Sequence, residues 1–255
     1  MIKVVDICKQ FGELKVLNDI NVSFERGKTN LIIGRSGAGK TVLLKILIGL
    51  IIPNSGTVYY DDIDFYKLNK KEVRKLRMQV GMLFQASALF DSYTVEQNIR
   101  FPLDMFTNFT PKEKTDRVNY CLERVNLEGV NHRMPSEVSG GMQKRVGIAR
   151  AIVMKPQYLF CDEPNSGLDP KTSILIDKLI QEITRENNIT TIINTHDMNS
   201  VMEIGEKIIL LQDGHLVWQG SSSEVLSSNN EVIQNFIFAS PFLQKLKTLA
   251  IEKNK

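Results

Sequence analysis

The sequence predicts an α/β fold with a parallel sheet at its core and a helical insertion in the middle of the chain. Short apolar runs alternate with helical segments along most of the 255 residues, an order typical of parallel strands joined by helices. Leu31-Ile32-Ile33 is continuously apolar, as is typical of a strand buried on both faces. Between about residues 87 and 156 the character shifts toward helices, and this stretch is the predicted insertion.

The individual elements follow from periodicity and from turn or cap residues. Ile20, Val22 and Phe24 alternate with polar neighbours, the period of a half-buried strand. Asp213-Gly214 predicts the turn of a hairpin. Thr110-Pro111 predicts a helix start, with a cap followed by proline at the first position. Further strands are expected at 56–60, 80–84, 189–195, 207–211 and 215–218, and helices at 39–50, 142–153 and 170–187.

Composition indicates a folded globular chain. Apolar residues make up 42% of it and the formal net charge is only +3, which excludes a disordered polyelectrolyte. The basic stretch 67–77 favours a solvated helix face over nucleic-acid binding, because no aromatic residues interleave with it. A membrane surface or an acidic partner loop would explain it equally well. We therefore expect no nucleic-acid partner.

Targeting and redox signals are weak in this sequence. Cys8, Cys121 and Cys161 are scattered and odd in number, so we expect reduced thiols rather than disulfides or a zinc site. The N-terminus does not resemble a signal peptide. The longest apolar run, 42–52, is too short to span a bilayer. Any membrane role is therefore expected to come through a partner chain.

The most specific motif is a glycine-rich loop that follows the buried strand and opens a helix. Its pattern, Gly34-x-x-x-x-Gly39-Lys40-Thr41, lets backbone N–H groups surround a phosphate at a helix N-terminus. Lys40 is expected to reach the β- and γ-phosphates of ATP, and Thr41 to offer its hydroxyl to Mg²⁺. The expected nucleotide contacts are Gly34, Arg35, Ser36, Gly37, Ala38, Gly39, Lys40, Thr41 and Val42.

Two adjacent carboxylates end the apolar segment 158–162. In this type of site an Asp at the end of a neighbouring strand holds Mg²⁺, and we assign that role to Asp162. Glu163 is the expected general base for the attacking water, a role that contributes about 10²–10⁴-fold to the rate. The alternative is that Glu163 serves only as a structural ion-pair partner.

A histidine and a glutamine also follow predicted strands directly. His196 comes after the strand 189–195, where its side chain could bind the γ-phosphate and steady the water. Gln85 follows the strand 80–84, where its amide could contact Mg²⁺ or the water. The alternatives are a purely structural histidine and an ordinary surface glutamine.

A second anion site is predicted far downstream. Ser139-Gly140-Gly141 opens a helical segment and offers exposed N–H groups and a hydroxyl at a helix start. Two phosphate sites so distant in one chain are explained by two ATP molecules held head-to-tail between two copies, in a two-fold symmetric interface. The alternative is a helix cap that binds no ligand.

The order of these motifs resembles that of ATP-binding cassette (ABC) ATPases, from the N-terminus to about Ser228. The resemblance implies a P-loop NTPase (RecA-like) core with an N-terminal antiparallel β subdomain and the helical subdomain inserted at about 87–156. The cassette would span 1–228 and a C-terminal tail 229–255. It also implies a homodimer that hydrolyses ATP at the cytoplasmic face of the inner or plasma membrane, attached through an integral-membrane permease.

The same resemblance assigns roles to individual residues. Ser139–Gln143 is similar to the signature loop, Gln85 to the Q-loop glutamine and His196 to the switch histidine. Phe11 stands where the family places an aromatic side chain that stacks on adenine. Asp169, in Ser166-Gly167-Leu168-Asp169, resembles the D-loop aspartate that reports across the dimer.

One departure from the usual pattern suggests a subfamily. Met142 replaces the glutamine that ordinarily ends the signature, and Gly-Gly-Met resembles the ATPases of Mla-type lipid transporters that work with MCE-domain proteins. The sequence 81–95 is similar to that branch as well. The cargo would then be phospholipid or another lipid. The alternatives are a cassette for another small molecule, a non-transport ABC protein and a regulatory nucleotide-binding module.

The C-terminal tail is more apolar than a solvated end. It contains the stretch 232–238, followed by Phe242 and Leu243. Either this segment packs on its own domain, or it crosses to the second protomer and stabilises the dimer. The residues leave both possibilities open.

Overall fold

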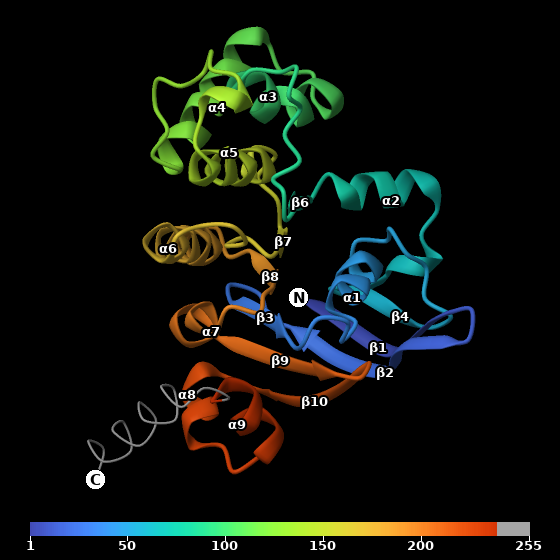
Figure 1. The fold of residues 1–255 in the computed structure, drawn as a ribbon. Coiled ribbons are helices and arrows are strands. Elements are labelled where there is room, and N and C mark those ends of the chain that lie inside the picture. Colours follow the sequence, from blue (N-terminus) through green and yellow to red (C-terminus); the bar gives the residue numbers. More distant parts are fainter. Residues whose placement is uncertain (239–255) are drawn as a thin grey trace.

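A computed structural model describes residues 1–238, which form two sheets and a set of helices (Figure 1). The smaller sheet has the strand order β2-β1-β4-β5 and is antiparallel. Its strands are β1 (Ile2–Phe11), β2 (Leu14–Phe24), β4 (Ser55–Tyr60) and β5 (Ile63–Asp64). An antiparallel β unit at the N-terminal side was expected from the family resemblance, and the structure contains it.

The larger sheet has the order β10-β9-β3-β8-β7-β6. All neighbouring strands in it are parallel except β9 and β10, which form a hairpin. Its strands are β3 (Thr29–Ile33), β6 (Val80–Leu83), β7 (Tyr158–Asp162), β8 (Thr190–Asn194), β9 (Lys207–Gln212) and β10 (His215–Gly220). This sheet confirms the predicted parallel core, the buried strand over 31–33 and the hairpin at Asp213-Gly214.

Helices follow the parallel strands and fill the predicted insertion. Threonine caps with a reciprocal glutamine or glutamate begin α3 and α4, satisfying backbone N–H groups at each start. The helices are α1 (Lys40–Leu47), α2 (Lys70–Arg77), α3 (Val95–Phe106), α4 (Pro111–Arg124), α5 (Gly140–Ile152), α6 (Pro170–Glu186), α7 (Met198–Ile204), α8 (Ser222–Ser227) and α9 (Glu231–Ile237), with short 3₁₀ turns at Phe65–Lys67 and Pro135–Glu137. The basic stretch lies on α2, which is the predicted solvated helix face.

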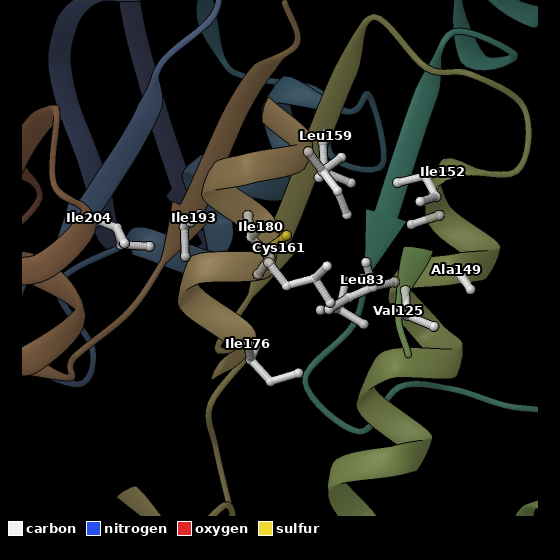
Figure 2. Close-up of a cluster of buried hydrophobic side chains, with 14 of the residues drawn as sticks. Leu83, Val125, Ala149, Ile152, Leu159, Cys161, Ile176, Ile180, Ile193 and Ile204 are labelled. Carbon is white, nitrogen blue, oxygen red and sulfur yellow. The ribbon is translucent and has the colours of Figure 1, made fainter. Parts of the chain in front are cut away.

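A large apolar core joins the parallel sheet to the helices on one of its faces. Figure 2 shows Leu83, Leu159 and Cys161 from the strands near Ile152 of α5 and Ile176 of α6. Each of these five side chains is at most 6% exposed. Burying a large aliphatic side chain stabilises the fold by about 1.5–3 kcal/mol. The inserted helices are therefore fixed to the sheet by the same core that holds the strands.

The end of the described chain packs on its own domain. Ile233, Ile237 and Phe238 are buried in the core that contains the parallel sheet. Residues 231–238 thus follow the simpler of the two alternatives for the tail, while Phe242 and Leu243 lie outside the described residues. No helix within residues 1–238 is both long and apolar enough to cross a membrane.

Candidate nucleotide site

The parallel sheet brings the predicted site residues to one edge. Parallel strands all end on the same side, and β3, β8 and β7 are neighbours. The glycine-rich loop leaves β3 after Ile33, Asp162 ends β7, and His196 follows β8 by two residues. This edge is where ligands bind in open α/β sheets.

The loop of residues 34–39 requires its glycines. Gly34, Gly37 and Gly39 have φ values of 150°, 83° and 98°, in the left-handed region that side chains disfavour. A Cβ atom on Gly34 would lie 2.3 Å from the carbonyl oxygen of Leu211. The backbone therefore forms a narrow cradle that only glycine permits, and this cradle fits a phosphate chain.

Lys40 closes the cradle at the start of α1. Its Nζ donates to the carbonyl oxygens of Gly34, at 2.7 Å, and Arg35, at 3.2 Å. Burial lowers the pKa of the ammonium, and the nearby Glu163 and Asp162 carboxylates partly oppose that shift. The side chain is only 9% exposed. A cation with little water around it interacts strongly with a phosphate placed in the loop.

The remaining loop residues are mostly open. Arg35, Ser36 and Gly37 are exposed, whereas Ala38 is buried beneath them. Thr41 is exposed in the first turn of α1, and Val42 is half-buried against an apolar cluster that contains residues of both sheets.

Asp162 and Thr41 offer oxygen ligands suited to Mg²⁺. Asp162 is half-buried at the end of β7 and accepts a hydrogen bond from Asn194 Nδ2 at 3.1 Å. The Oδ1 atom of Asn194 is buried and has no partner within residues 1–238. These oxygens at the cradle fit a hard divalent cation. Asn194 was not predicted from the sequence, although it ends a strand two residues before His196.

Glu163 and His196 are in direct contact. Glu163 Oε2 lies 2.8 Å from His196 Nδ1, and the two side chains are 16% and 69% exposed. The backbone of Glu163 has a φ of 49°, rare for a residue with a side chain. Its N–H donates to the carbonyl oxygen of Asn194 at 2.9 Å. The carboxylate is thus held beside the histidine that was expected to steady the attacking water.

Gln85 lies near this pair but faces a neighbouring loop. Its Nε2 donates to Ser166 Oγ at 3.3 Å, so the amide contacts the predicted D-loop in this structure. Its carbonyl oxygen accepts from Lys144, a buried lysine of α5 whose Nζ also lies 3.5 Å from the carbonyl oxygen of Glu163. Lys144 was not predicted from the sequence, because it stands in a run of polar residues on a helix.

Ser139 stands apart from the cradle in the single chain. Its Oγ accepts from the N–H of Met142 at 3.3 Å and caps α5, which begins in the inserted helical layer well away from α1 (Figure 1). Ser139 and Gly140 are exposed and Gly141 is half-buried. One chain therefore does not bring the two predicted phosphate sites together.

Phe11 and Asp169 are also exposed. Phe11 ends β1 with 48% of its surface open, and Lys9 Nζ lies 5.0 Å from its ring centroid. Asp169 caps α6, accepting from the N–H groups of Lys171 and Thr172 at 3.1 and 3.0 Å. Both positions leave a surface free for a ligand or a second chain.

Comparisons with known proteins identify the family of the chain. The family model described as "ABC transporter" matches residues 17–166. The chain is 37% identical over 236 residues to the probable ribonucleotide transport ATP-binding protein mkl of Mycobacterium leprae, covering 92% of this chain and 68% of the relative. It is 40% identical over 222 residues to the methionine import ATP-binding protein MetN 1 of Bacillus thuringiensis, covering 87% of this chain and 65% of that relative.

Solved structures show the same fold. A dimeric post-hydrolysis state of the ATP-binding cassette MJ0796, bound to ADP and Pi, superposes with a TM-score of 0.79 at 32% identity, covering 87% of this chain and 99% of that one. The cbiO1 subunit from Clostridium perfringens, part of the transporter complex cbiONQ, gives 0.83 at 29% identity, covering 98% of both chains.

The chain belongs to the ABC transporter family and is an ATP-hydrolysing cassette of that family. The P-loop NTPase fold expected from the family resemblance is confirmed. This chain spans about two thirds of the length of the two relatives named above, 68% and 65%.

Proposed function

We propose that two copies of this chain hold two ATP molecules with Mg²⁺ between them, and that hydrolysis drives a membrane transporter. The contact between Glu163 and His196, 2.8 Å long, carries this proposal. It places a carboxylate and an imidazole at the sheet edge that also holds Lys40 and Asp162. A carboxylate there can accept the proton of an attacking water.

Different residues of the chain take different roles at the cradle. Lys40 and the cradle N–H groups hold the phosphates, and Phe11 stacks on the adenine ring. Thr41, Asp162 and Gln85 are the residues that would hold Mg²⁺, which neutralises the phosphate charge when bound. Glu163 takes the proton from water, and His196 orients that water and the terminal phosphate.

The second chain would complete each site. The exposed helix start at Ser139, Gly140 and Gly141 offers a hydroxyl and free N–H groups to the terminal phosphate of the ATP held by the partner. Asp169 would lie at the same interface. The dimeric state of the related cassette MJ0796 supports this arrangement. Glu163→Gln should stop hydrolysis while ATP binding persists, and normal turnover would remove Glu163 from its role.

An apolar groove supports a permease contact. A cavity of about 410 Å³ lies between the edge strand β6 and the helical layer, and Phe84, Phe90 and Phe106 on its wall are 40–42% exposed. Exposed aromatic clusters of this kind mark interaction sites. The cbiO1 relative is part of a transporter complex. We propose that a permease segment docks here, on the cytoplasmic face of the inner or plasma membrane.

The proposed cargo is phospholipid or another lipid, moved with an MCE-domain partner. The Gly-Gly-Met signature at 140–142 supports this proposal. The relatives are named for ribonucleotide transport and methionine import, so an importer of a small polar molecule is the second candidate. The reconstituted transporter should show ATPase stimulation by phospholipid vesicles carrying its partner proteins. Stimulation by methionine or a ribonucleotide instead would favour the second candidate.

A further inference from the structure

A buried polar cluster lies behind the Glu163–His196 pair. Asn165 Nδ2 donates to Asp177 Oδ1 at 2.8 Å and to Ser200 Oγ at 3.0 Å. The three residues are 8%, 3% and 1% exposed. Hydrogen bonds in such surroundings are stronger than hydrogen bonds in water.

The cluster joins three segments that carry site residues. Asn165 comes two residues after Glu163, and Asp177 lies on α6, which begins after Asp169. Ser200 lies in the first turn of α7, shortly after His196. One amide therefore links the loop of the general base, the D-loop helix and the helix behind the switch histidine.

The loop that carries Glu163 needs such a link. The φ of 49° at Glu163 is a disfavoured conformation that persists only where the surroundings hold it. A cavity of about 640 Å³, with Glu163, Ser166 and His196 in its wall, adjoins the loop. The loop therefore borders a hollow, and the hydrogen bonds of Asn165 help to restrain it.

The cluster is poorly suited to stabilising the fold alone. Asn165 Oδ1 is buried without a partner in the described part of the chain. Burial raises the pKa of Asp177 to about 6, its bonds to Ser200 and Asn165 oppose this, and the Asp197 and Glu203 carboxylates add to it. Burial and then the charge of Asp177 raise the pKa of the Cys161 thiol on β7. Costly buried polar groups are expected where function requires them.

We propose that Asp177 is a positioning residue that, through Asn165 and Ser200, holds the loops of Glu163 and His196 in the arrangement needed for hydrolysis. This inference rests on the proposed function of the Glu163–His196 pair. It predicts that the rate of the chemical step falls while nucleotide binding stays unchanged. The cradle at 34–41 follows β3 and contains none of the three cluster residues. Neither Asn165 nor Asp177 touches the nucleotide in this account.

The test is a double-mutant cycle on the full chain, measured by steady-state ATPase kinetics and ATP binding. Asn165→Ala and Asp177→Ala should each lower kcat about tenfold, with KM for ATP within about twofold, since small displacements of catalytic groups have large effects on rate. The double variant should be no slower than the worse single variant, because both changes break one link. Asp177→Asn keeps an oxygen acceptor for Asn165 and should recover most of kcat.

Glu182→Ala is the matched control, because Glu182 is an exposed acid on the same helix. Wild-type kcat in folded Asn165→Ala and Asp177→Ala, or effects that add in the double variant, would overturn the inference. If the alanine variants at 165 and 177 do not fold, Ser200→Ala removes one hydroxyl from the cluster and should lower kcat about threefold. An unchanged kcat there would also overturn it. An inactive wild type would instead contradict the proposed function.

Discussion

The two halves of the proposed ATP site differ in how the fold prepares them. The cradle half lies on the parallel sheet, where Lys40 is 9% exposed and Gly34 packs against the backbone of Leu211. The Ser139 half is an exposed helix start whose hydroxyl makes only a weak 3.3 Å cap. One half is assembled within a single chain around a buried lysine, and the other consists of donors at an exposed helix start.

The difference explains why a single chain has an incomplete site. Preorganised donors in a buried setting bind charge without a large cost of rearrangement. Donors at an exposed helix end are screened by water until a second surface covers them. ATP binding is therefore expected to depend on the cradle half, and hydrolysis on both.

The largest effect is expected at the general base. Glu163→Gln removes the proton acceptor but keeps the shape of the side chain, so kcat should fall about 10²–10⁴-fold. ATP affinity should remain within about twofold, because the cradle is untouched. Single-turnover hydrolysis and equilibrium ATP binding measure the two effects, with Glu182→Gln on α6 as the control. A comparable loss of ATP affinity would show that ATP binding and ATP hydrolysis cannot be separated at this residue.

The buried Asp177 behind the Glu163–His196 pair gives a pH test of stability. The pKa of Asp177 is raised from 3.8 to about 6 by burial, so the folded chain binds this proton more tightly than the unfolded chain. The stabilisation is full only well below the unfolded pKa of 3.8 and is lost as pH rises through 6, a change of about 3 kcal/mol. Asp177→Asn lacks this titration. Its stability relative to wild type should therefore rise by about that amount between about pH 3 and pH 7 in urea unfolding, and a constant difference would contradict the assignment.

Lys40→Ala should weaken ATP binding about 10–100-fold, the value of a charge-assisted hydrogen bond of about 1.5–3 kcal/mol. Lys45→Ala is the matched control, since Lys45 is an exposed lysine on the same helix. Isothermal titration with ATP and Mg²⁺ measures the change. Equal affinities for the two variants would count against the cradle as the binding half.

Ser139→Ala should have the smallest effect of the four, because it removes one neutral hydrogen bond worth about 0.5–1.5 kcal/mol. We expect kcat about 3–10-fold lower, with ATP affinity unchanged. Ser136→Ala, at an exposed serine in the preceding turn, provides the comparison. A drop in ATP affinity of a single protomer would break the contrast between the two halves.

The cradle half was largely predictable from the sequence. The apolar run at 31–33 and the glycine spacing after it predicted a strand, then a loop, then a helix. Carboxylates, an amide and a histidine were each expected at a strand end, and they lie at one edge because the strands are parallel. The direct contact of Glu163 with His196 depends on β7 and β8 being neighbours, which no local pattern indicates.

The polar cluster behind the site was not predictable. Asp177 lies in an amphipathic helix, where an acid next to Ile176 is ordinarily solvated. It is buried because α7 packs on α6, a contact set by the path of the chain after β8. Lys144 was not predicted for a similar reason, because its contacts with the carbonyl oxygens of Gln85 and Glu163 join segments distant in the sequence. Both residues gain their roles from tertiary packing, which periodicity does not encode.

The most direct test of the shared-nucleotide account is the mass of the Glu163→Gln chain in solution with Mg²⁺ and ATP, measured by light scattering. We expect twice the 28.9 kDa chain mass with ATP and the monomer mass without it. Adding Ser139→Arg, which places a long side chain at the open helix start, should abolish the ATP-dependent dimer. An ATP-bound chain that stays monomeric at every concentration, or a dimer indifferent to Ser139→Arg, would contradict it.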